Sequence, residues 1–81
     1  MNNTEFITSG KLIALGFEDM PTIAEIGIKS GVLTKNGVNI CQNGDDFMKN
    51  QYTIYYEGSY KKVQTIGELK ESFQYFTNEP L

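Results

Sequence analysis

An Asn-Gly pair near the middle of the chain constrains its fold more than any other sequence feature. Both central residues of a type I′ turn need positive φ angles, which asparagine and glycine adopt with little strain. Asn36–Gly37 is therefore the strongest hairpin signal in the chain and predicts a two-residue turn between antiparallel strands. The turn also fixes the register of those strands, because it places Leu33 opposite Ile40.

A second turn signal precedes this hairpin. Ser30–Gly31 favours a two-residue turn, and the alternation of residue types over residues 22–29 predicts a strand before it. Pairing through that turn places Ile28 opposite Leu33, which already lies opposite Ile40. The three apolar side chains then form one row across the sheet, and a register slip would break the row. The two turns together predict an antiparallel meander.

A further hairpin is expected in the second half of the chain. Residues 43–51 predict a loop, after which the segments Tyr52–Tyr56 and Ser59–Val63 predict two strands. Glu57–Gly58 provides the two-residue turn between them. Because side chains alternate between the two faces of a strand, this register divides the hairpin into an inner and an outer face.

A short helix is predicted near the N-terminus. Thr8 or Ser9 can cap its first turn, and Gly16 stands where a left-handed C-terminal cap belongs. Phe6 and Ile7 precede the helix, and we expect both to pack back on it as a hydrophobic staple. A helix of this length is not stable alone, so it must dock on the rest of the domain.

The C-terminal segment predicts the clearest element of the chain. Thr65 and Glu68 have the spacing of a capping box, in which each side chain accepts from the backbone N–H of the other residue. Asn78 can end the helix, and Pro80 prevents its continuation. Apolar residues recur at three- and four-residue steps and form one stripe. This stripe consists of Ile66, Leu69, Phe73 and Phe76.

These signals predict one small α+β domain over residues 1–81. We expect an antiparallel β-meander of four to five strands, with the N-terminal and C-terminal helices packed on one face. A chain of this length can bury a single modest core. The expected core residues are Leu12, Leu15, Ile26, Ile28, Leu33, Ile40, Ile54, Leu69, Phe73 and Phe76.

Both ends of the chain contain short sequence motifs that recur in other proteins. The start contains Ile7-Thr8-Ser9, Leu12 and Leu15-Gly16-Phe17-Glu18, and the end contains Leu69, Phe73, Phe76, Thr77, Asn78 and Leu81. These motifs resemble the two ends of small uncharacterised phage and prophage proteins of anaerobic gut bacteria. Ser72 and Gln74 stand where that family usually has apolar residues. The resemblance spans about thirty residues of caps and packing positions. It implies a helix–antiparallel sheet–helix module in a phage or prophage setting, and it implies no site.

The chemical inventory of the chain is poor for catalysis. Histidine and arginine are both absent, which removes the usual acid/base near neutral pH and the usual bidentate clamp for phosphate. Asn43, Asp45 and Asp46 offer oxygen ligands, but they lack the alternating spacing and terminal glutamate of a calcium loop. Cys41 has no histidine to activate it and is expected as a small buried or half-buried strand residue. We therefore predict no enzyme, no catalytic residue, no metal and no cofactor.

Charge and hydropathy bound the partners. The net charge of −3 argues against nucleic-acid binding, which needs a basic field. No apolar run approaches the ~20 residues that cross a bilayer, and no signal peptide is visible, so we expect no membrane partner. The single cysteine fits a reducing, cytoplasmic location. A homo-oligomer is also compatible with the sequence, because association would supplement the modest core.

The expected binding surface is the outer face of the second hairpin. Its turn places Tyr55 opposite Tyr60 and Thr53 opposite Lys62, and all four side chains are predicted to face solvent. Tyrosine is enriched at interaction hot spots, which favours a partner-binding role for this surface. The alternative is a cross-strand tyrosine pair that only stabilises the sheet.

Three classes of function follow, in decreasing order of support. The first is a non-catalytic protein-interaction module encoded by a phage or mobile element, which could inhibit a host defence protein. The second is an oligomer that sequesters a small molecule such as a nucleotide, although the acidic balance and the lack of arginine weigh against it. The third is an enzyme, which the residue inventory disfavours.

Overall fold

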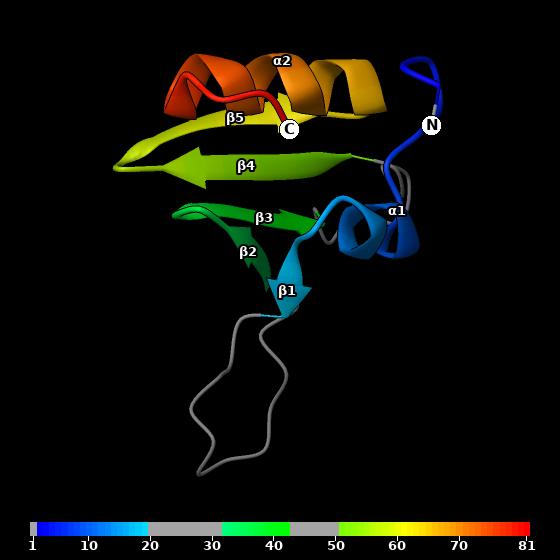
Figure 1. Ribbon diagram of the computed structural model, residues 1–81, viewed down its shortest axis with the longest axis horizontal. Coiled ribbons are helices and arrows are strands. Elements are labelled where there is room, and N and C mark those ends of the chain that lie inside the picture. Colours follow the sequence, from blue (N-terminus) through cyan, green and yellow to red (C-terminus); the bar gives the residue numbers. More distant parts are fainter. Residues whose placement is uncertain (1, 20–31, 43–50) are drawn as a thin grey trace, which may run out of the picture.

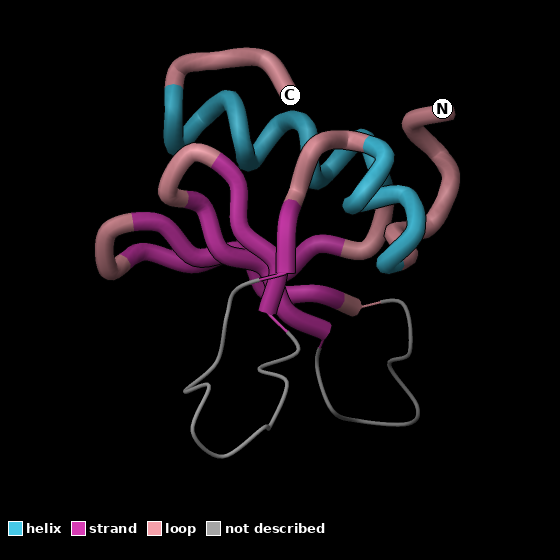
Figure 2. The backbone as a smooth tube through the Cα atoms, turned by 60° about the horizontal axis from the view of Figure 1, so that its bottom comes forward, coloured by secondary structure: helices cyan, strands magenta, loops and turns pink. Residues whose placement is uncertain are grey.

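Five strands that follow one another along the chain pair in the same order in space. The computed structural model describes residues 2–19, 32–42 and 51–81. In these residues the elements are α1 (Ser9–Ala14), β1 (Glu18–Asp19), β2 (Val32–Lys35), β3 (Val38–Gln42), β4 (Tyr52–Tyr56), β5 (Ser59–Val63) and α2 (Ile66–Thr77). The sheet has the order β1-β2-β3-β4-β5, and all its pairs are antiparallel. Both helices lie on one side of it (Figures 1 and 2). The predicted α+β meander is confirmed.

The two hairpin turns set the register of four of the five strands. Asn36 and Gly37 have φ angles of 50° and 82°, and Glu57 and Gly58 have φ angles of 47° and 84°. Both turns therefore have the positive φ pair of a type I′ turn, whose twist matches that of the strands. Leu33 lies opposite Ile40 as predicted.

The neighbour of β2 on its other side differs from the prediction. Asp19, and not Ile28, lies opposite Leu33, because β1 occupies that edge of β2. The chain reaches this position through Gly16, whose φ of 98° turns it out of α1. Three predicted features lie outside the described residues. They are the strand over residues 22–29, the turn at Ser30–Gly31, and residues 43–50 of the loop predicted over 43–51.

The N-terminal segment forms one β-bridge before it enters α1. Thr8 is the N-cap of α1, and its hydroxyl accepts from the backbone N–H of Lys11 at 3.2 Å. Phe6 forms an antiparallel bridge with Thr65. Because side chains alternate along an extended segment, Ile7 points into the core while Phe6 stays 52% exposed. The predicted staple therefore contains Ile7 only, and the expectation for Phe6 was wrong.

The same segment also covers the start of α2. The backbone N–H of Ile66 donates to the carbonyl of Glu5 at 2.9 Å, and that of Gly67 donates to Asn3 at 2.8 Å. Within α2, the predicted capping box of Thr65 and Glu68 is present. These bonds satisfy amides that the first turn of a helix leaves unpaired. The two ends of the chain are thereby held together. The helix ends at Asn78, which is left-handed as expected.

The core lies between the helices and the inner face of the sheet. The predicted residues Leu12, Leu33, Ile40, Ile54, Leu69 and Phe73 are buried. Leu15 and Phe76 are only partly buried at its margin, and Ile26 and Ile28 lie outside the described residues. Six further residues complete the core. They are Ile7, Phe17, Val38, Tyr52, Val63 and Ile66.

Candidate functional site

The outer face of the β4–β5 hairpin carries a pair of exposed tyrosines. Tyr55 lies directly opposite Tyr60, as the turn at Glu57–Gly58 predicts. Their ring centroids are 6.2 Å apart and the rings are tilted by 40°. Tyr55 is 43% exposed and Tyr60 is 65% exposed. The pair lies on the side of the sheet away from the helices, because the inner positions of β4 are taken by Tyr52, Ile54 and Tyr56.

The tyrosine pair ends a row that crosses the whole sheet. Glu18 lies opposite Thr34, Thr34 opposite Asn39, Asn39 opposite Tyr55, and Tyr55 opposite Tyr60. All five side chains share the outer face because register partners point to the same side. Sequence reasoning missed the first three residues of this row. The β3–β4 pairing is not set by a two-residue turn, so no local signal could place Asn39 beside Tyr55.

The second predicted pair is placed differently from the first. Thr53 lies opposite Lys62 as predicted, and Lys62 is exposed. Thr53, however, is only 5% exposed, so its prediction as a solvent-facing residue was wrong. It sits on an inner strand between Cys41 and Lys62, which flank it on both sides. Cys41 is half-buried, as expected for a strand residue.

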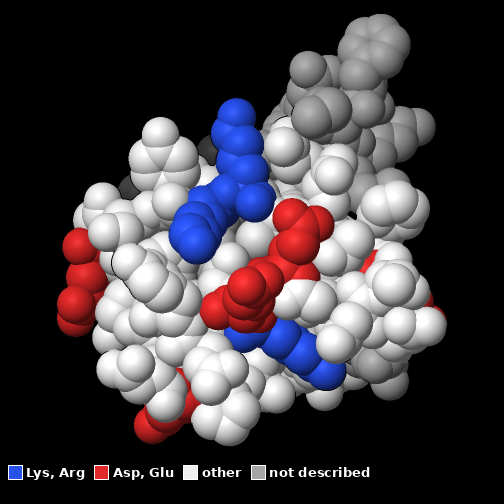
Figure 3. Space-filling model, turned by 90° about the horizontal axis from the view of Figure 1, so that it is seen from above, with Lys and Arg blue, Asp and Glu red and all other residues white. Residues whose placement is uncertain are grey.

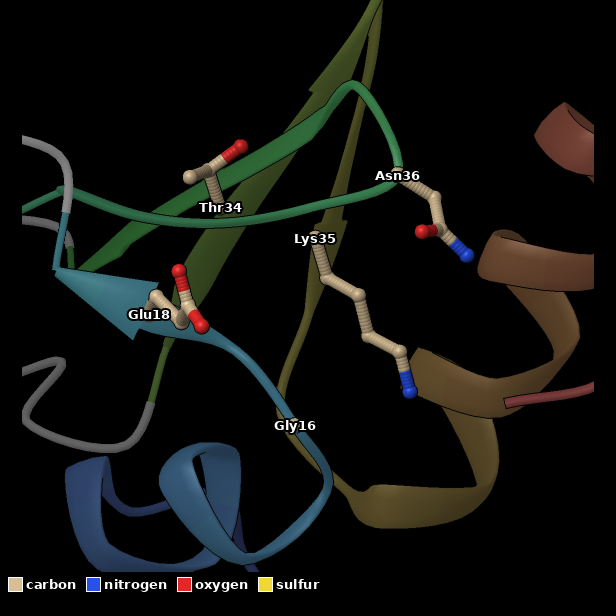
Figure 4. A pocket seen from close by; sticks show the side chains of 5 residues that line it. All are labelled: Gly16, Glu18, Thr34, Lys35 and Asn36. Atoms are coloured by element: carbon tan, nitrogen blue, oxygen red, sulfur yellow. The ribbon is translucent and has the colours of Figure 1, made fainter.

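A polar pocket of about 300 Å³ lies at the opposite edge of the sheet. Figure 4 shows the side chain of Lys35 reaching past Gly16 toward α2, away from Thr34 and Glu18. Its Nζ donates to the carbonyl of Leu15 at 2.6 Å and lies 5.9 Å from the centre of the Phe73 ring. A lysine that binds the last carbonyls of a helix stabilises the helix end. We therefore interpret this pocket as part of the structure of the α1 end.

Two lysines, Lys11 and Lys35, are held at separate carbonyl groups. Lys11 donates to the carbonyl of Phe6 and forms an ion pair with Glu5 at 3.5 Å, while Lys35 is held at Leu15. On the α2 side of the molecule, acidic and lysine side chains lie beside one another (Figure 3). Lys11 and Lys35 are thus each held by the backbone and do not form a clamp for a phosphate group.

Neither a metal-binding cluster nor a membrane-spanning helix is found among the described residues. Among them, no three histidine, cysteine or acidic side chains stand close enough together to hold a metal ion. The loop residues Asn43, Asp45 and Asp46 lie outside that part of the chain. No helix in the described ranges is long and apolar enough to cross a membrane.

Comparison with known proteins completes the description of the site. The chain was compared with protein-family models, with curated proteins and with solved structures, and no match was found in any of the three.

Proposed function

We propose that this chain is a non-catalytic protein-interaction module that binds a partner protein through the outer face of the β4–β5 hairpin. The observation that carries the proposal is the exposed cross-strand pair of Tyr55 and Tyr60. Lys62 on the same face and Asn39 beside Tyr55 supply polar groups around the two rings. Thr53, being buried, is left out of the contact surface.

The physical properties of the pair suit recognition. A tyrosine ring offers a large apolar contact area and a hydroxyl group, and few rotatable bonds are frozen when it binds. Here both rings stand on directly paired strands of a sheet, with their centroids 6.2 Å apart. A surface that is ordered before binding loses less entropy on association.

The class of partner is proposed on the resemblance of the chain ends alone. In a phage or prophage setting, a cytoplasmic host defence protein that the module inhibits is the first partner to test. This part of the proposal is independent of the binding surface, which any protein partner could use.

The proposal is tested by two tyrosine substitutions and one matched control. Tyr55→Ala and Tyr60→Ala each remove one ring of the pair, whereas Ile13→Ala removes an exposed apolar side chain from α1, on the other side of the sheet. A partner recovered from host lysate with the parent protein is identified by mass spectrometry, purified, and titrated against each variant. Truncation of a hot-spot tyrosine typically costs about 2 kcal/mol or more. The two hairpin variants should therefore bind roughly 30-fold more weakly or worse.

The melting temperatures of the variants decide whether the loss is one of binding. An exposed cross-strand pair contributes at most about 1 kcal/mol to stability, so both hairpin variants should remain folded. The Ile13→Ala control should keep the parent's affinity. Full affinity in Tyr55→Ala and Tyr60→Ala would refute the binding face. A nucleotide absorbing near 260 nm that co-purifies in place of a protein would favour the sequestering function instead.

A further inference from the structure

Among the described strands, β5 forms one edge of the sheet, next to the tyrosine pair. In a two-residue hairpin the residues that flank the turn form a hydrogen-bonded pair, here Tyr56 with Ser59. Because hydrogen-bonded positions alternate, the backbone groups of Ser59, Lys61 and Val63 face β4. Those of Tyr60 and Lys62 face outward, and the structure gives them no strand partner among the described residues.

The chain itself fills one end of this edge with an isolated β-bridge. The carbonyl of Gln64, the next outward-facing residue after Lys62, accepts from the backbone N–H of Ile7 at 2.9 Å. Phe6 and Thr65 form the adjoining antiparallel bridge. The N-terminal segment then turns into α1 and leaves the edge. The position of a sixth strand is thus filled beyond residue 63, and no described residue occupies it beside Tyr60 and Lys62.

The two lysines of β5 favour an acidic strand at this edge over a second copy of β5. Lys61 and Lys62 are both exposed, point to opposite faces of β5, and form no ion pair within the described part of the chain. The Nζ of Lys61 lies 4.8 Å from the centre of the Tyr75 ring on α2, which leaves its charge without an acidic partner there. In the two-fold pairing that would use both outward-facing residues, Lys61 of one copy would oppose Lys61 of the other. Like charges directly opposite each other destabilise a strand pair, and edge lysines commonly prevent such self-pairing. A segment with carboxylate side chains would instead meet both lysines favourably.

We propose that β5 binds an extended acidic segment of the partner protein as a sixth strand beside Tyr60 and Lys62. This inference rests on the proposed function and adds the way in which the partner binds. Main-chain hydrogen bonds to the two outward-facing residues supply part of the affinity, and alternate side chains supply specificity. On the outer face, the added strand would extend the surface formed by Tyr55 and Tyr60. The free stretch from the turn to the N-terminal segment accommodates about four residues.

Hydrogen exchange of the backbone amides tests the inference on the parent protein. The probe is a blocked peptide, acetyl-Asp-Val-Glu-Val-Asp-amide, with acetyl-Lys-Val-Lys-Val-Lys-amide as its charge-reversed control. At saturation the acidic peptide should slow exchange at Tyr60 and Lys62 by at least about tenfold, since their amides become hydrogen-bonded. The Lys61 amide, which already faces β4, should change little. The control peptide should have no effect.

Two outcomes of this experiment would overturn the inference. Unchanged exchange at Tyr60 and Lys62 with the acidic peptide would show that the edge does not accept it. Protection of the same amides on raising the protein concentration alone would assign the edge to a second copy of the chain.

A pair of substitutions at Lys62 separates the backbone contribution from the charge. Lys62→Pro removes the outward N–H, and proline is tolerated on an edge strand where its nitrogen faces solvent. Lys62→Gln keeps the N–H and removes the charge. The proline variant should bind the peptide and the partner at least about tenfold more weakly, because one hydrogen-bonding group is left unpaired. The glutamine variant should bind more tightly than the proline variant.

The variants also distinguish failure of this inference from failure of the proposed function. If Lys62→Pro folds and keeps full affinity for peptide and partner, the edge is not the binding site, whatever the tyrosine variants show. In a second outcome, Lys62→Pro alone loses the partner while Tyr55→Ala and Tyr60→Ala retain it. That result would support binding at the β5 edge and refute binding through the tyrosine pair. If Lys62→Pro does not fold, the exchange data on the parent protein decide.

Discussion

Truncation of Phe73 is the substitution from which we expect the largest loss of stability. Its side chain is fully buried and packs edge-on against Phe17, with ring centroids 6.1 Å apart and the rings inclined by 76°. A buried Phe→Ala change costs about 3–5 kcal/mol through lost burial and the remaining cavity. A domain of this length has a total stability of roughly 4–12 kcal/mol. Phe73→Ala should therefore remove about a quarter of that stability or more.

The measurement is a thermal melt followed by far-ultraviolet circular dichroism. For a domain of this size each kcal/mol shifts the melting temperature by about 4–8 °C, so Phe73→Ala should lower it by at least roughly 12 °C. The matched control is Phe76→Ala on the same helix, because Phe76 is only partly buried. Its cost should be about 1–2 kcal/mol, in proportion to the smaller area removed from water. Equal melting temperatures for Phe73→Ala and the parent would refute the packing of α2 on the sheet.

Two further predictions concern backbone geometry. Glu57→Asn should raise the melting temperature by a few degrees, because Glu57 has a φ of 47° at a type I′ turn where asparagine is preferred; a lower value would contradict this turn assignment. Gly67→Ala should lower the melting temperature although alanine is the better helix former by about 1 kcal/mol, because an added Cβ would lie 3.1 Å from the carbonyl oxygen of Asn3. A gain in stability there, measured in the same melts, would show that the N-terminal segment does not pack against α2.

Local chemistry let the sequence alone determine the turns, the caps and much of the register. Asn36–Gly37 and Glu57–Gly58 each fix a pairing within a few residues, so Leu33 with Ile40 and Tyr55 with Tyr60 could be predicted. The capping box of Thr65 and the left-handed Asn78 depend only on neighbours in the chain. The tyrosine pair of the candidate site could be predicted from the sequence for the same reason.

Only the tertiary structure decided the contacts between segments that no short turn connects. The pairing of Asp19 with Leu33, the bridge between Phe6 and Thr65, and the burial of Thr53 all depend on chain segments far apart in the sequence. Such contacts are selected by the packing of the whole core, because an amino acid's propensity carries no information about which distant segment will lie beside it. The extent of the β5 edge is decided in the same way, because the N-terminal segment occupies the end of it beyond residue 63.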